Sequence, residues 1–360
     1  MLRPSWLRNL RNLRRRRQRR ILWIMYHGTL QRAEVPILES LGFGVFIPSG
    51  ADLGSAVARD GGRLTIDNDS NGALEQHAFY TSAWSPHLSK IINSEFDLVV
   101  TAAYQVPLIQ ALMHFEGPVI ARVFGREGDA TYARLFEHYG CDDLIKRNLK
   151  RFILGQAYSN IAKNEPAFLE KVSQTIGCSI PKSTWDKRGT WVRRRDDILF
   201  MCPRFETIPY YRDLYTAFKS HFGSIAHSIA GIQDRPSEDP TVLGFLSNEE
   251  LFDRYASSAA FVYTSPEPRH LHYSPLEAMI VGAPVLYLTG SMLATLAGAS
   301  LAGECASLPH MRDKAVRIVS GDRALQNEII TAQPRVLSFF SDEIVRAQWR
   351  AVLTRLHLCP

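Results

Sequence analysis

Two short turns in the first half of the sequence carry residues that can act on a substrate. His27-Gly28 and Gly125-Arg126 each follow an apolar run that is typical of a buried strand. Open α/β sheets bind ligands just past the carboxyl ends of their strands. A histidine there can act as a general base or bind a substrate oxygen, and a glycine lets a ligand approach the backbone. Both turns also fit ordinary strand-to-helix connections, so the two interpretations stay open.

The alternation of apolar runs with helical patterns places these turns in a layered α/β fold. Strands are expected at 21–26, 45–47, 97–101, 118–123 and 158–162, with a long helix over 131–154 and a loop over 51–72. No GxGxxG pattern follows the first strand, so a dinucleotide cofactor is not expected. The first half is therefore predicted to be Rossmann-like.

A charged stretch without periodicity, residues 181–197, is interpreted as an interdomain linker in which Arg193, Arg194 and Arg195 are solvated. Ser247 is the expected N-cap of a helix in the second half, and another helix is expected to begin at Tyr273 and end at Gly282. Strands are expected at 197–202, 228–231, 241–244, 259–264 and 283–288.

Two motifs in the second half resemble a known family. SPLEAMIVGAPVLYL (274–288) and LGFLSNEELFDRYASSAAFVYTSPE (243–267) are similar to the nucleotide-sugar domain of GT-B glycosyltransferases, in particular the retaining family with a Glu-x7-Glu motif. The resemblance covers residues 198–288. It implies an α/β fold with two Rossmann-like domains facing each other across a cleft.

The domains that this resemblance implies can be placed along the chain. Residues 21–185 would form the N-terminal acceptor domain, and 196–340 the C-terminal nucleotide-sugar domain. The C-terminal helix, 341–360, either crosses back to the first domain, as in many GT-B proteins, or is an ordinary terminal helix. Residues 1–20 stand apart as a basic amphipathic tail.

The resemblance also implies a donor site. The turn His272-Tyr273-Ser274 precedes a helix, whose N-terminal amides and dipole suit a phosphate. Glu277 matches the family's glutamate that binds the ribose hydroxyls, since a carboxylate offers two acceptors. Arg204 matches an arginine that neutralises the departing diphosphate. No metal and no cofactor are expected.

Three positions depart from the family's pattern. Arg269 stands where the first glutamate of Glu-x7-Glu belongs, and Glu267 is displaced from that position by two residues. His270 and His272 replace small residues. The stereochemical outcome is therefore left open, and Arg269 is assigned instead to binding the diphosphate or an acidic sugar.

The net charge of +6 is concentrated in the tail. Residues 1–20 hold nine arginines and no acidic residue, which leaves 33 basic against 36 acidic side chains in the rest of the chain. A leucine and tryptophan stripe opposite these arginines fits an anionic membrane surface. A basic extension without structure, or a segment that contacts nucleic acid, would have the same composition. Of these, we expect no nucleic-acid partner.

Together these features predict a glycosyltransferase. It would transfer a sugar from a nucleoside-diphosphate sugar to a membrane-associated saccharide, polyprenol-linked or glycolipid acceptor in surface polysaccharide synthesis. His27 and Arg204 are the expected catalytic residues, and His27, Gly28 and Arg126 would face the acceptor. The expected location is the cytoplasm, peripheral on the inner face of the plasma membrane, because no stretch is apolar enough to span it and no disulfide framework is evident. The alternative is an inactive GT-B-fold scaffold in a glycan assembly complex.

Overall fold

The computed structural model describes residues 18–48 and 72–359, so the predictions for the basic tail and the 51–72 loop fall outside the described residues, apart from Gln18, Arg19, Arg20 and Gly72. The chain divides into two compact units. Unit 1 comprises 1–123, 131–179 and 342–360, and unit 2 comprises 124–130 and 180–341. The segment 124–130 thus groups with unit 2, although it directly follows a strand of unit 1.

Unit 1 is built on a six-stranded parallel sheet with the order β2-β1-β3-β4-β5-β6. Its strands are β1 (Arg20–Ile24), β2 (Gly44–Phe46), β3 (Leu98–Ala102), β4 (Val119–Val123), β5 (Phe152–Gln156) and β6 (Ser173–Thr175). Chain order reverses between β1 and β3. Ligands of open parallel sheets bind at such a topological switch point.

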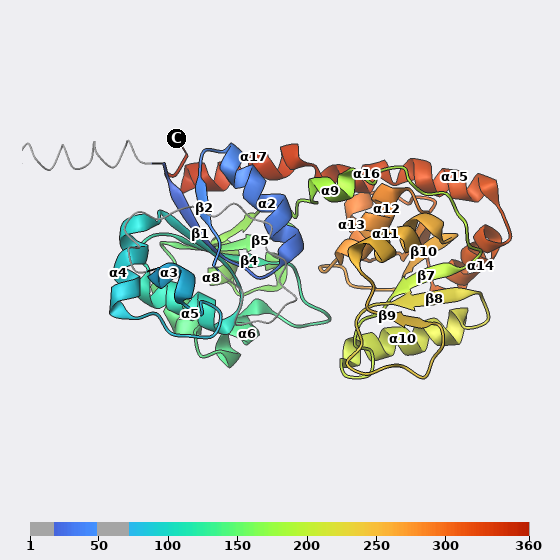
Figure 1. The fold of residues 1–360 in the computed structure, drawn as a ribbon, viewed down its shortest axis with the longest axis horizontal. Helices are drawn as coiled ribbons and strands as arrows, with labels where there is room; N and C mark the ends of the chain where they lie inside the picture. The colour runs from blue at the N-terminus through green and yellow to red at the C-terminus, as the bar shows by residue number, and fades with distance from the viewer. Residues whose placement is uncertain (1–17, 49–71, 360) are drawn as a thin grey trace, which may run out of the picture. The chain divides into compact units, whose positions relative to one another are not determined.

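The helices of unit 1 cover both faces of this sheet (Figure 1). They are α2 (Gly28–Ser40), α3 (Ala73–Gln76), α4 (Pro86–Glu95), α5 (Gln105–His114), α6 (Tyr132–His138), α7 (Asp142–Arg147), the 3-10 helix η2 (Ala162–Asn164), α8 (Ala167–Lys171) and α17 (Asp342–Arg355). The C-terminal helix α17 lies against α2, so the two ends of the described chain pack together (Figure 1).

A buried ion pair lies beneath α17. Arg122 of β4 and Glu34 of α2 have fully buried side chains, with Nη2 of Arg122 2.6 Å from Oε1 of Glu34. The same guanidinium donates to the carbonyl oxygens of Gly155 and Ile176 and lies 5.8 Å from the ring centre of Trp349 on α17. These hydrogen bonds offset part of the cost of removing the charges from water.

Unit 2 contains a second six-stranded parallel sheet with the order β12-β11-β10-β7-β8-β9. Its strands are β7 (Ile198–Met201), β8 (His227–Ala230), β9 (Val242–Gly244), β10 (Ala260–Tyr263), β11 (Val285–Leu288) and β12 (Glu304–Cys305). Chain order reverses between β7 and β10, which is the switch point of the dinucleotide-binding fold.

Helices α10 and α14 of unit 2 contact each other, as do α11 and α12. The helices are α9 (Lys182–Trp185), α10 (Pro209–Phe222), α11 (Asn248–Ser257), α12 (Tyr273–Val281), α13 (Met292–Ala297), α14 (Leu308–Val319), α15 (Arg323–Ala332), α16 (Pro334–Leu337) and the 3-10 helix η3 (Ser338–Phe340). Phe200 of β7 stacks on Phe218 of α10, with ring centres 4.2 Å apart, and anchors that helix in the core.

Most expected elements are confirmed, including the N-cap Ser247, whose side chain forms a capping box with Glu250. The expected helix over 131–154 is wrong. It is split into α6 and α7, with Gly140 at a φ of +67° between them. Helix α7 ends at Arg147, and the buried strand β5 begins at Phe152. The expected strand at 158–162 is also wrong, because the chain turns there into η2.

The predicted linker is part of unit 2. It contains α9, and the backbone amides of Gly189 and Trp191 donate to carbonyl oxygens of α12. Of the three arginines expected to be solvated, Arg194 and Arg195 are exposed. The expectation is wrong for Arg193, whose side chain is 11% exposed and donates to Asp196 and to the carbonyl oxygen of Val319.

Candidate functional site

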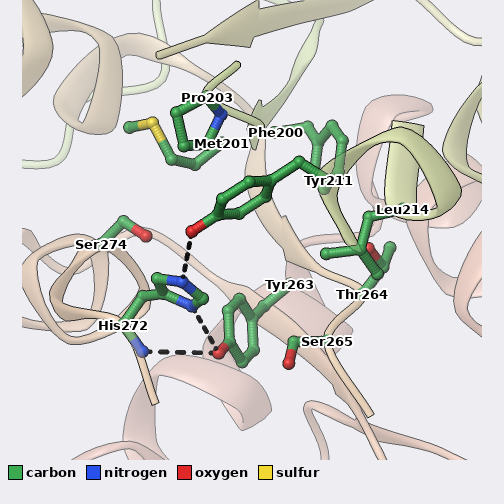
Figure 2. Close-up of a pocket in the computed structure, with 10 residues that line it drawn as sticks. All are labelled: Phe200, Met201, Pro203, Tyr211, Leu214, Tyr263, Thr264, Ser265, His272 and Ser274. Atoms are coloured by element: carbon green, nitrogen blue, oxygen red, sulfur yellow. Dashed lines mark hydrogen bonds between the residues drawn. The ribbon is translucent and has the colours of Figure 1, made fainter. Parts of the chain in front are cut away.

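A small pocket opens at the switch point of unit 2 (Figure 2). It lies between the carboxyl ends of β7 and β10 and the first turns of α10 and α12, and encloses about 50 Å³. That volume suits a few water molecules or one phosphate-sized group. Its lining residues are Phe200, Met201, Pro203, Tyr211, Leu214, Tyr263, Thr264, Ser265, His272 and Ser274.

One histidine joins two tyrosines in this pocket (Figure 2). The Nε2 atom of His272 lies 2.9 Å from the hydroxyl of Tyr211, and its Nδ1 atom lies 3.1 Å from the hydroxyl of Tyr263. The Nε2 atom of His270 lies 3.4 Å from the same Nε2 atom of His272. His270 and His272 stand out in the sequence, but their contacts with Tyr211 and Tyr263 were not predicted, because the members come from three separate segments.

Burial keeps this network uncharged. Desolvation, with a smaller contribution from His270, lowers the pKa of His272 to about 3. Desolvation raises the pKa of Tyr211 to about 12 and also raises that of Tyr263. The imidazole and both phenols are therefore neutral near pH 7.

The predicted donor residues on α12 lie along its first turns. His272 is the N-cap residue, Tyr273 begins the helix, and Ser274 lines the pocket. Glu277 is one turn further on and accepts a hydrogen bond from the buried hydroxyl of Tyr255, at 3.1 Å. Tyr255 fixes the direction of this carboxylate, a role that the sequence analysis missed.

The two predicted arginines do not line this pocket. Nε of Arg204 lies 3.3 Å from the Asp234 carboxylate, and its backbone has a φ of +48°, which is unusual for a residue with a side chain. Arg269 donates from Nη2 to the carbonyl oxygen of Gly128 at 2.7 Å.

The segment 124–130 is attached to the loop that follows β10. The Gly128 amide donates to the buried Glu267 carboxylate at 3.0 Å. Gly125 has a φ of +88°, and a Cβ atom there would lie 1.9 Å from the carbonyl oxygen of Arg269. Only glycine fits this contact. Arg126, expected on the acceptor side of the first domain, belongs to this segment and hence to unit 2.

A shallower hollow of about 390 Å³ lies at the carboxyl ends of β8 and β9. Asp234, the partner of Arg204, lines it, as do Ile232 and Phe245. The Phe245 side chain is 72% exposed, which is unusual for a phenylalanine and leaves a flat apolar face for a planar group.

In unit 1, His27 serves as the N-cap of α2. Its Nδ1 atom accepts the amide N–H of Leu30 at 3.3 Å. Burial lowers the pKa of this imidazole. A neutral ring that accepts at Nδ1 carries its proton on Nε2, so His27 is better suited to donating a hydrogen bond than to acting as a general base. Gly28 is the first residue of the same helix.

Tyrosines surround the switch point of unit 1. Tyr26, just before His27, stacks on Tyr104 with ring centres 4.3 Å apart and packs edge-on against Tyr80. Tyr104 follows β3, so the stacked pair spans the two strands between which chain order reverses. This cluster was not predicted from the sequence, where Tyr26 is visible only as the last residue of an apolar run.

No protein-family model matches this chain, and no curated protein matches it. Solved structures do match. A glycosyltransferase from Rickettsia africae ESF-5 aligns with a TM-score of 0.62 and 12% identity, covering 94% of this chain and 99% of that chain. Anabaena Alr3699/HepE in complex with UDP-glucose gives 0.60 and 13%, covering 93% and 99%.

A sucrose-phosphate synthase from Thermosynechococcus elongatus aligns with a TM-score of 0.59 and 13% identity, covering 95% of this chain and 100% of that chain. At these identities the likeness is one of fold. With its two parallel six-stranded sheets and their helices, the chain has the α/β GT-B fold of these glycosyltransferases.

Proposed function

We propose that this protein is a glycosyltransferase that uses a nucleoside-diphosphate sugar as donor. The observation that carries the proposal is the pocket of unit 2, which combines a sheet switch point with the start of α12. The fold is shared with a glycosyltransferase from Rickettsia africae and with Anabaena Alr3699/HepE, which was solved with UDP-glucose, and this supports the same assignment.

In this proposal the donor extends from the pocket towards Glu277. The carboxylate accepts hydrogen bonds from the ribose hydroxyls, and the Tyr255 hydroxyl holds it in place. The exposed face of Phe245 offers a stacking surface to the base. Arg204 neutralises diphosphate charge after leaving Asp234.

The test is a thermal-shift screen against UDP-, GDP-, ADP- and dTDP-sugars, starting with UDP-glucose because Alr3699/HepE binds it. A donor at 100 times its dissociation constant stabilises the folded state by about 2.7 kcal/mol. E277Q keeps the shape of the side chain but removes its charge, and should reduce the shift. If none of the four donors changes the melting temperature, the proposal is wrong.

We propose that protein groups, and not a bound metal, neutralise the donor diphosphate. The start of α12 and Arg204 provide the positive potential. Turnover should then persist in excess EDTA. Loss of turnover in EDTA, restored by added Mg²⁺ or Mn²⁺, would contradict this.

The acceptor is proposed to be a membrane-associated saccharide, polyprenol-linked or glycolipid, used in surface polysaccharide synthesis on the inner face of the plasma membrane. No helix of the described residues is long and apolar enough to cross a membrane. The seven arginines in residues 1–17 would instead hold the protein to anionic lipid, each contributing about 1 kcal/mol near the surface. Arg20 belongs to β1 and pairs with Glu95.

Vesicle co-sedimentation tests this part of the proposal. The full chain should bind vesicles containing phosphatidylglycerol in low salt but not neutral phosphatidylcholine vesicles. A chain lacking residues 1–17, which leaves β1 complete, should lose the binding. Equal binding by both chains would contradict a membrane role for the tail.

A catalytically inactive scaffold is the second candidate, because Arg269 replaces an acidic residue of the resembled family and is engaged with Gly128. Donor hydrolysis separates the two functions. An active transferase should slowly release free sugar from its donor without an acceptor, whereas a scaffold would bind the donor and leave it intact.

A further inference from the structure

The Tyr211 hydroxyl is held at the pocket by a chain of hydrogen bonds whose proton positions can be worked out. The chain begins at His270, whose Nδ1 atom lies 3.1 Å from the carbonyl oxygen of Phe124. A carbonyl oxygen only accepts, so Nδ1 of His270 carries a proton. In a neutral ring its Nε2 atom is then an acceptor.

This acceptor determines the tautomer of His272. The Nε2 atoms of the two histidines are 3.4 Å apart, so His272 must present N–H at Nε2 or two lone pairs would face each other. Its Nδ1 atom then accepts the hydroxyl proton of Tyr263, whose oxygen in turn accepts the backbone amide of His272. The one Nε2–H of His272 is then shared between Nε2 of His270, at 3.4 Å, and the Tyr211 oxygen, at 2.9 Å.

The tautomer sets the direction of the Tyr211 hydroxyl. Because Nε2 of His272 donates to the Tyr211 oxygen at 2.9 Å, the proton of Tyr211 must point elsewhere. Tyr211 and Ser274 both line the pocket (Figure 2). Ser274 is 8% exposed, and its hydroxyl makes no hydrogen bond to another residue within 18–48 and 72–359.

The start of α12 needs such side-chain donors. Of the amides that usually remain unpaired at a helix N-terminus, that of His272 is engaged by Tyr263, and Pro275 has none. The backbone therefore offers an anion fewer donors than an ordinary helix start. The hydroxyls of Tyr211 and Ser274 lie where they can make up this deficit.

We infer that Tyr211 and Ser274 form an uncharged hydrogen-bond-donor site for a phosphate oxygen, in which His270 and His272 are positioning residues that turn the Tyr211 hydroxyl outward. The inference rests on the proposed use of a nucleoside-diphosphate donor and adds the residues that recognise its phosphate. It makes the paired histidines, which depart from the resembled family, part of the binding site.

The experiment compares the binding of UDP with the binding of uridine. If the thermal screen selects a donor with another base, the nucleoside diphosphate and the nucleoside of that base are compared instead. Titration calorimetry measures the diphosphate, and competition NMR measures the weaker nucleoside. Y211F should weaken UDP binding about ten- to hundredfold, as expected for a lost hydrogen bond to a charged group, and leave uridine within twofold. S274A should show the same selectivity.

Y210F is the matched control. The neighbouring Tyr210 hydroxyl bonds to Ser265 and does not line the pocket, so this variant should bind UDP as the wild type does. H272F should reproduce the loss of Y211F, and the double variant should lose no more than either single variant, because both remove one oriented donor.

The outcomes separate this inference from the proposed function. If the wild type binds no diphosphate, the proposed function fails, and the phosphate site with it. If the wild type binds UDP but Y211F binds it equally well, or loses UDP and uridine alike, the phosphate site is wrong. If H272F folds and its effect adds to that of Y211F, the positioning role of His272 is wrong; should H272F not fold, Y211F and S274A still decide the site.

Discussion

At the scale of single residues, His27 illustrates how a structural role limits a chemical one. Its place after a strand predicted a catalytic role. In the folded chain its Nδ1 atom caps α2, so the proton of the neutral ring is carried by Nε2. The imidazole can therefore stabilise the helix and bind an acceptor oxygen at the same time.

Two substitutions separate these roles. H27A removes the cap and should destabilise the protein by about 0.5–2 kcal/mol in urea denaturation. H27N restores a capping side chain and should recover most of that stability. If Nε2 binds the acceptor, the KM for acceptor should rise in both variants; a normal KM in H27N would show that capping is the only role of His27.

His272 should make the protein sensitive to acid. Its pKa is about 3 in the folded state and near 6.5 when exposed, so the unfolded chain binds the proton more readily as pH falls below 6.5. Burial and His270 cause the shift, with the uncharged Tyr211 and Tyr263 hydroxyls on either side. The loss should reach about 2 kcal/mol at pH 5.

Urea denaturation between pH 8 and pH 5 measures this effect, and H272F provides the comparison. The variant should lose much less stability over that range, because it has no imidazole to protonate. An equal loss in both proteins would place the acid sensitivity elsewhere.

At the scale of elements, the packing of the segment 124–130 against the loop after β10 depends on Gly125. A Cβ atom at Gly125 would collide with the backbone of Arg269, and the φ of +88° is strained for any other residue. G125A should therefore lower the melting temperature and disturb the loop that leads to His272.

Gly128 supplies the matched control. It also has a positive φ, +59°, but a Cβ atom there meets nothing within 4 Å. G128A should cost only about 1 kcal/mol of conformational strain. If G125A and G128A are equally stable in thermal denaturation and bind donor equally well, the close contact with Arg269 is unimportant.

At the scale of the whole molecule, unit 1 depends on both ends of the described chain. Helix α17, near the C-terminus, lies against α2, and Arg122 and Glu34 form their ion pair beneath it. Breaking such a pair is costly because it leaves one charge buried without a partner.

Chemical denaturation should reveal that cost. R122M leaves the Glu34 carboxylate unpaired and should destabilise the protein by about 3–5 kcal/mol. R122M/E34Q removes both charges and should recover part of the loss. A double variant no more stable than R122M would mean that packing against Trp349, rather than charge, accounts for the contribution of Arg122.

The sequence by itself determined the two parallel sheets, most of their strands and the start of α12. These depend on local signals: buried apolar runs, helix caps such as Ser247, and the SPLEAMIVGAPV motif. It did not distinguish β5 from the end of a helix, because a short apolar run fits either element.

Only the tertiary structure decided what the polar residues contact. Tyr211, Tyr263 and His270 meet at His272 because strand order brings β7 beside β10, and spacing along the chain does not reveal that order. The tertiary structure also pairs Arg204 with Asp234 and places Arg269 in a hydrogen bond to Gly128. Side-chain hydrogen bonds join residues that are distant in sequence, so their partners are known only once the sheets have formed.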